Sequence, residues 1–218
     1  MLAACSLRAA AAKVFAENSI STLSKGYRKW YPFDMSYYDN IFEIASENFG
    51  LITTAQARKM GIAKEELGKL QARGKLHRVG RGVYRVKHYA PSSLDIYADA
   101  AALVGPEAYV LGESVLAMQN LASVNPEAIT VGTPKRVRKQ LPCYVKVVQR
   151  TCGDTVTLYD GIPCMTVADS IRYCEGKVMP DRLEEALVDA LAEGLVTKRD
   201  VEAIRKELTW HNPSNPIK

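Results

Sequence analysis

The sequence predicts an α+β protein in which a winged helix-turn-helix is followed by a mixed α/β domain. Two observations support this fold class. Residues 39–86 carry the patterns of helix, short strand, helix, turn, helix, strand, turn and strand, which is the order of a winged helix. Residues 94–208 then mix short β-branched runs with amphipathic helical patterns, which is typical of a domain that packs helices on a sheet.

The composition is that of a soluble globular protein, with 47% hydrophobic and 24% charged residues. The net charge of +5 at pH 7 is modest, so it matters only where basic residues cluster. The five cysteines lack metal-binding spacing, which predicts reduced, mostly buried thiols rather than disulfides or a zinc site. No apolar run approaches the ~18 residues that a membrane helix needs. We therefore expect a cytoplasmic protein.

The residues before the first predicted helix are rich in alanine and serine. Residues 2–5 resemble a lipoprotein cleavage box but lack the charged start and apolar run that precede one. The aromatic residues at 27–31 fit a transit peptide poorly. The expected division is an extension outside the core fold over 1–34, a winged helix-turn-helix over 36–89, an α+β domain over 92–208 and a mobile tail over 209–218.

The first three helices are predicted from apolar spacing and glycine stops. They are expected at residues 39–49, 55–60 and 64–73. Gly50 and Gly61 are placed to end the first two, and Thr53 and Thr54 are good caps for the second. The third helix buries its two leucines, so its other face is expected to be open to solvent.

A basic stretch begins in the last turns of the third helix, with seven basic residues and no acidic one from Lys69 to Lys87. Gly80 and Gly82 flank Arg81 in a tight turn between two strands, which lets that turn approach a DNA backbone closely. In a winged helix the third helix lies in the major groove, where lysines donate to guanine or phosphate and a glutamate accepts from cytosine. Hairpin arginines contact phosphates. We expect DNA contacts from Lys64, Glu65, Lys69, Arg73, Lys75, Arg78, Arg81 and Arg85.

Charge alone leaves a second interpretation open, because many basic surfaces are only solvated. The same face can belong to a protein-interaction module that contacts an acidic partner without reading DNA sequence. The order of helices together with the glycine-flanked hairpin favours DNA.

The second domain is predicted from caps and β-branched runs. Helices are expected at 94–104, 114–121, 166–176, 182–193 and 198–208, and strands at 109–111, 129–131, 144–148 and 155–158, with a turn at 159–163. Ser92 with Asp95 predicts a capping box for the first of these helices. Between two strands lies a second basic run, whose members are Lys135, Arg136, Arg138 and Lys139. It is a solvated loop, a second phosphate-contacting patch or a docking face for an acidic partner.

The mixture of strands, helices and a basic loop also raises the alternative of a metal-dependent nuclease. Such a site needs an acid on one strand and an acid-x-lysine pair on the next to hold a divalent cation. Glu113 is available on a helix, but the strand around Thr130 has no carboxylate and Lys146 lacks an acid two positions earlier. The three histidines suggest no nucleophile–base pair. We therefore predict no catalytic residue, no metal and no cofactor.

Several phrases of the sequence carry a family resemblance. The stretch from Gly74 to Tyr84 (GKLHRVGRGVY) is the most specific, and it is similar to the hairpin of the AbiEi family of type IV toxin–antitoxin antitoxins. Weaker similarities lie at residues 50–57 (GLITTAQA), 61–62, 129–135, 159–169 and 183–195. Together they cover residues 36–208. The chain departs from the family at Ala63, where such domains often place a serine that caps the third helix.

The resemblance implies a bacterial or archaeal protein that represses its own operon. The winged helix would bind inverted repeats in double-stranded promoter DNA, and a second copy could join it there. The second domain would be an antitoxin domain that counteracts a nucleotidyltransferase-like toxin, without a need for a stable complex with it. Neither membrane attachment nor an enzyme activity is implied.

Overall fold

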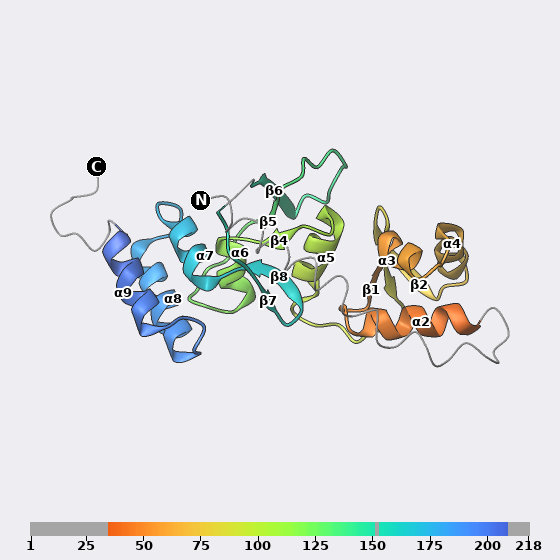
Figure 1. Cartoon of the computed structure of the whole chain (residues 1–218), viewed down its shortest axis with the longest axis horizontal. Helices are drawn as coiled ribbons and strands as arrows, with labels where there is room; N and C mark the ends of the chain where they lie inside the picture. The colour runs from red at the N-terminus through yellow and green to blue at the C-terminus, as the bar shows by residue number, and fades with distance from the viewer. Residues whose placement is uncertain (1–34, 151–152, 209–218) are drawn as a thin grey trace, which may run out of the picture. The chain divides into compact units, whose positions relative to one another are not determined.

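The computed structural model describes residues 35–150 and 153–208 (Figure 1). The extension expected over 1–34 and the mobile tail expected over 209–218 lie outside the described residues. The chain divides between Asn40 and Ile41 into two units, of which the first is described only over its last six residues, 35–40.

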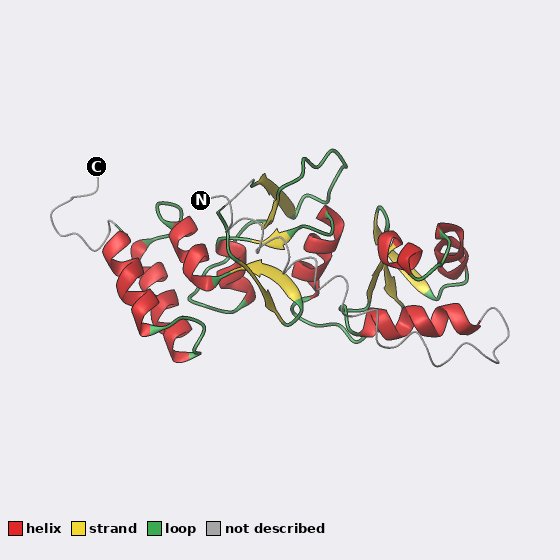
Figure 2. Ribbon diagram, viewed as in Figure 1, coloured by secondary structure: helices red, strands yellow, loops and turns green. Residues whose placement is uncertain are grey.

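A winged helix occupies residues 41–89, which we call the reader segment (Figure 2). Its elements are α2 (Met35–Ser46, which crosses the boundary between the units), β1 (Leu51–Thr53), α3 (Thr54–Lys59), α4 (Lys64–Ala72), β2 (Leu76–Gly80) and β3 (Val83–Val86). The three strands form an antiparallel sheet in the order β1-β3-β2. Both the predicted order of elements and the hairpin are therefore confirmed.

Local caps explain where the reader helices begin and end. The side chain of Thr53 accepts a hydrogen bond from Gln56 N, and the Gln56 side chain accepts one from Thr53 N, so α3 begins with a capping box. The prediction that the first helix extends to Phe49 is wrong. Phe49 has φ 53° and Gly50 has φ 70°, and Gly50 N donates to Ala45 O at 2.7 Å, which closes α2 at Ser46 instead.

The second segment, residues 92–208, holds a mixed sheet of five strands with helices packed on it. Its elements are α5 (Asp95–Val104), β4 (Tyr109–Val110), α6 (Glu113–Met118), β5 (Ile129–Thr133), β6 (Val145–Gln149), β7 (Val156–Tyr159), β8 (Ile162–Met165), α7 (Val167–Cys174), α8 (Pro180–Ala192) and α9 (Lys198–Glu207). The strand order is β6-β5-β4-β8-β7, with β5/β6 and β4/β8 parallel. The α+β fold class is confirmed.

Two local predictions in this segment are wrong. The capping box expected from Ser92 is absent, because the Asp95 carboxylate accepts a hydrogen bond from the Tyr89 hydroxyl at 3.1 Å instead of capping α5. Pro163 was expected in a turn and lies inside β8. The turn is shorter, and β4 pairs with β8 only at Cys164, so no partner strand requires an N–H from the proline.

Two hydrophobic cores support the second segment. The first lies between the sheet and α5 and also contains Leu51 and Val83 of the reader sheet. The second lies among α6, α7, α8 and α9, which gather at one end of this segment (Figure 1). Burial raises the pKa of the Cys164 thiol to about 11 and that of Cys174 to about 12. Both are therefore protonated core residues, as the sequence predicts.

Candidate nucleic-acid interface

Helix α4 presents one polar face to solvent. Leu67 and Leu70 are buried on the opposite face, at 0% and 6% exposure. Because a helix repeats every 3.6 residues, this burial turns the intervening positions outward. This face is open, as the sequence predicts, and its exposed positions include Lys64, Glu65, Gly68, Lys69 and Ala72.

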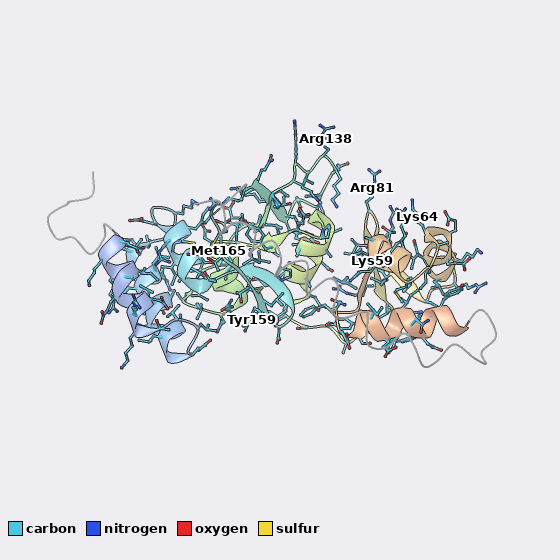
Figure 3. All side chains as sticks on the ribbon, in the orientation of Figure 1. Lys59, Lys64, Arg81, Arg138, Tyr159 and Met165 are labelled. Atoms are coloured by element: carbon cyan, nitrogen blue, oxygen red, sulfur yellow. The ribbon has the colours of Figure 1, made fainter. Side chains whose placement is uncertain are left out.

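The hairpin turn places Arg81 at its tip. Gly82 has φ 79°, a conformation that glycine adopts without strain, and a side chain at Gly80 would collide with Leu103 of α5. Gly82 therefore allows the tight turn, and Gly80 allows the hairpin to pack closely against α5. Arg81 and Lys64 both point to the upper edge of the reader segment in the view of Figure 3.

An open hollow lies between the C-terminal end of α4 and the hairpin. Its volume is about 520 Å³, and it is lined by Gln71, Gly74, Leu76, His77, Arg78 and Lys87. Arg78 therefore lies on the side of the hairpin that borders α4, where its Nε donates to Gly80 O at 3.3 Å. Sequence reasoning left Lys87 out of the candidate site, although the basic stretch contains it.

The exposed cations of the reader segment differ in the partners that they have. Lys69 makes an ion pair with Glu66 at 2.7 Å, but both groups are exposed, so the pair stabilises little. Lys64, Glu65 and Arg81 make no hydrogen bond or ion pair within the described parts of the chain. The remaining candidates of the basic stretch, Arg73 and Lys75, are exposed.

The structure places Arg85 away from this open face. Its Nη2 lies 3.0 Å from the Asp99 carboxylate and 3.7 Å from that of Asp95, and its Nε donates to Phe49 O at 3.3 Å. Burial raises the pKa of the Asp99 carboxyl, and the nearby Arg85 guanidinium lowers it in part. Arg85 therefore joins β3 to α5, and we remove it from the set of expected DNA contacts.

The structure adds basic residues that sequence reasoning missed. Arg58 and Lys59 form the exposed last turn of α3, the helix before α4 (Figure 3). The sequence contains a signal for these residues, because Arg58 and Lys59 stand just before Gly61, where the helix is expected to end. Cations at a helix end of this kind are suited to phosphate contacts.

The second basic run lies in the loop between β5 and β6. Lys135 pairs with Glu107 at 2.7 Å, whereas Arg136 and Arg138 are exposed and have no partner among the residues that the structure describes. Burial lowers the pKa of Lys139, and the positive charge of Arg81 lowers it further. Lys139 is thus close enough to the hairpin tip for the two charges to interact. We call the exposed cations of α4, the hairpin and this loop the basic surface: Lys64, Lys69, Arg78, Arg81, Arg136 and Arg138.

Residues 39–87 match a family model. It is described as the AbiEi antitoxin family of transcriptional regulators. The AbiEi match runs from α2 to the end of the hairpin and stops before the second segment, and it confirms the predicted resemblance over these residues. By this description the family consists of transcriptional regulators that are antitoxins. The match is therefore consistent with a DNA-binding role for the reader segment.

No curated protein sequence matches the chain. The crystal structure of the RV2827C protein from Mycobacterium tuberculosis is similar with a TM-score of 0.42 and 15% sequence identity, over 84% of this chain and 74% of that one. Within residues 35–150 and 153–208, no helix is long and apolar enough to cross a membrane. The same residues contain no group of three or more histidine, cysteine or acidic side chains that could hold a metal ion.

Proposed function

We propose that this chain is the antitoxin of a type IV toxin–antitoxin system and represses its own operon by binding promoter DNA. The observation that carries the proposal is the basic surface, whose arginines at the hairpin tip and in the β5–β6 loop have no carboxylate partner among the described residues. This surface begins within the segment that matches the AbiEi model. A winged helix binds a duplex by placing a helix in the major groove while cations contact the phosphates, and unpaired cations are available for those contacts.

Each residue is assigned its DNA contact from its position on α4 or on the hairpin. Helix α4 enters the major groove, where Lys64 and Lys69 donate to guanine or phosphate oxygens and Glu65 accepts from cytosine. Arg78 and Arg81 of the hairpin bind phosphates, which fixes the register of the helix on the duplex. Lys69 can exchange its exposed partner Glu66 for DNA at little cost.

The β5–β6 loop, which lies outside the reader segment, also contacts DNA. Arg136 and Arg138 extend the phosphate contacts, and a second copy of the chain binds the other half of an inverted repeat.

In the cytoplasm the second segment counteracts a nucleotidyltransferase-like toxin, with or without a stable complex. The resemblance to the AbiEi family supports this part of the proposal, and co-expression with such a toxin tests it through restored growth.

Fluorescence anisotropy with a duplex from upstream of the gene tests the DNA part. Affinity is expected to fall steeply with salt, and Arg78→Gln with Arg81→Gln is expected to flatten the slope of log K against log salt by about 1.8, at ~0.9 per lost phosphate contact. All duplex sequences should weaken alike. Lys69→Ala should instead reduce the preference for the promoter duplex by about 1–3 kcal/mol, the value of a base contact.

A matched control is Lys198→Gln with Arg199→Gln, which makes the same charge change on exposed residues at the start of α9. This pair should leave the salt slope unchanged. A flat salt response of the unmodified protein would refute the DNA proposal and favour the protein-interaction module. An equal loss of sequence preference in the hairpin and helix variants would mean that the two roles are assigned wrongly.

A further inference from the structure

A small cavity in the second segment lies outside the basic surface. It has a volume of about 90 Å³, and its lining residues come from α6, β5, β6, α7 and the loop after α7: Glu113, Thr130, Lys146, Val148, Tyr173 and Lys177. Thr130 and Lys146 are register partners on the parallel strands β5 and β6. Their side chains therefore project from the same face of the sheet, toward the end of α7.

One wall of this cavity is held rigidly. Gly112 has φ 61°, and a side chain there would lie 2.5 Å from the ring of Tyr173, so the turn into α6 packs directly against that ring. The Lys177 ammonium lies 3.1 Å from the ring centroid and the Arg150 guanidinium 5.3 Å from it. The aromatic ring is thus fixed by backbone contact and by two cations.

The charged groups of the cavity are not paired with one another. Lys146 and Lys177 are exposed, and neither they nor Glu113 form an ion pair with any described residue. Two ammonium groups and one carboxylate leave the cavity with a net positive charge. The Arg150 guanidinium beside Tyr173, by contrast, is paired with the Asp154 carboxylate.

The same positions are the ones that a metal-dependent nuclease would fill with acids. Here a helix supplies Glu113, but β5 supplies Thr130 and β6 supplies Lys146 without a second carboxylate. A divalent cation needs several oxygen ligands, usually carboxylates, and two lysines would repel it. The arrangement suits an oxyanion instead, because lysines and a threonine hydroxyl donate hydrogen bonds to oxygen.

The volume of the cavity limits the ligand. The cavity has room for a few waters or for a phosphate group, and the rest of a larger ligand would extend out of it. We propose that this cavity binds the phosphate of a phosphate monoester, either a free nucleotide or the 5′ end of a nucleic acid. Lys146, Lys177 and Thr130 bind the phosphate, and the Glu113 carboxylate lowers the net positive charge of the cavity.

Calorimetry with the full chain tests this proposal, with AMP, inorganic phosphate and adenosine as probes. AMP and phosphate should bind and adenosine should not. Lys146→Ala is expected to weaken AMP about tenfold or more, while Lys146→Arg retains binding. Glu113→Gln should strengthen the binding of both AMP and inorganic phosphate, because it removes a negative charge beside the bound phosphate.

Two controls place the binding in this cavity. Lys198→Ala, an exposed lysine on α9, should bind AMP as the unmodified chain does. Arg78→Gln with Arg81→Gln should also bind AMP normally, so that a failure of promoter binding and a failure of the cavity are separate results. Competition of AMP with a tetranucleotide, with and without a 5′-phosphate, distinguishes the two sources. Unchanged AMP binding by Lys146→Ala, or no AMP binding by the unmodified chain, would overturn the proposal.

Discussion

The reader segment and the helical end of the second segment both carry exposed arginines and lysines. They differ in whether these cations are paired with carboxylates. In the second segment Arg172 bonds to Glu207 and Asp169, and Arg205 bonds to Glu184. At the hairpin tip and the start of α4, the cations have no carboxylate partner among the described residues. A cation that is paired with a carboxylate stabilises the fold, whereas an unpaired cation is available to a ligand. Whether an arginine or lysine can bind a ligand therefore depends on its partner more than on its residue type.

Arg85 shows that this difference does not follow chain segments. It lies four residues after Arg81 on the same hairpin, yet it is half-buried against Asp99. The hairpin therefore has a tip that is open to ligand and a root that is part of the fold. Four predictions sharpen or break this contrast between paired and unpaired cations.

The largest effect is expected at Asp154. Its side chain is 5% exposed and accepts hydrogen bonds from Tyr109 and from two nitrogens of Arg150. Asp154→Asn leaves the Arg150 guanidinium without its counter-charge and should lower the free energy of unfolding by about 2 kcal/mol, measured by urea denaturation. Asp181→Asn, at an exposed position early in α8, is the matched control and should stay within ~0.5 kcal/mol.

The effect of Asp154 depends on pH. Burial alone would raise its pKa, but the hydrogen bonds from Arg150 and Tyr109 lower the pKa below its ordinary value. A carboxyl with a depressed pKa stabilises the fold above its unfolded pKa of about 3.9, and this contribution is lost as pH falls through the folded pKa. The stability gap between Asp154→Asn and the unmodified protein should therefore close below about pH 4. A gap that persists there would show that the charge is not the cause.

A smaller effect is expected at the hairpin root. Arg85→Met leaves the carboxylates of Asp95 and Asp99 without their cation and should cost about 1–2 kcal/mol of unfolding free energy, whereas Asp99→Asn should cost less because burial already disfavours its charge. The double variant should recover part of the loss. If Arg85 contacts DNA instead, Arg85→Met would weaken promoter binding without lowering stability, and the assignment of Arg85 to the fold would be wrong.

The smallest effect on stability is expected at the hairpin tip. Arg81→Gln removes an exposed charge without a partner, so the free energy of unfolding should change by no more than ~0.5 kcal/mol. Thermal denaturation at matched salt measures this. A clear loss of stability would mean that Arg81 belongs to the fold, which would remove the contrast between tip and root.

Most of the reader segment could be predicted from sequence because its signals are local. Thr53 with Gln56 supplies its own capping box, and the glycine-flanked turn specifies the hairpin. In the second segment, the helices expected at 182–193 and 198–208 are found as α8 and α9, and Thr197 with Asp200 forms a capping box at the start of α9. Such features depend on residues within one or two turns of one another, so a single sequence contains all the information they need.

What the sequence determined by itself is the order of elements, the open face of α4 and the position of the basic hairpin. Only the tertiary structure decided that Arg85 faces inward, that Asp95 bonds to Tyr89 rather than capping α5, and that Lys146 shares a cavity with Lys177. The physical reason is range. A charge acts on whatever lies within a few ångströms, and those neighbours come from distant parts of the chain that only folding brings together.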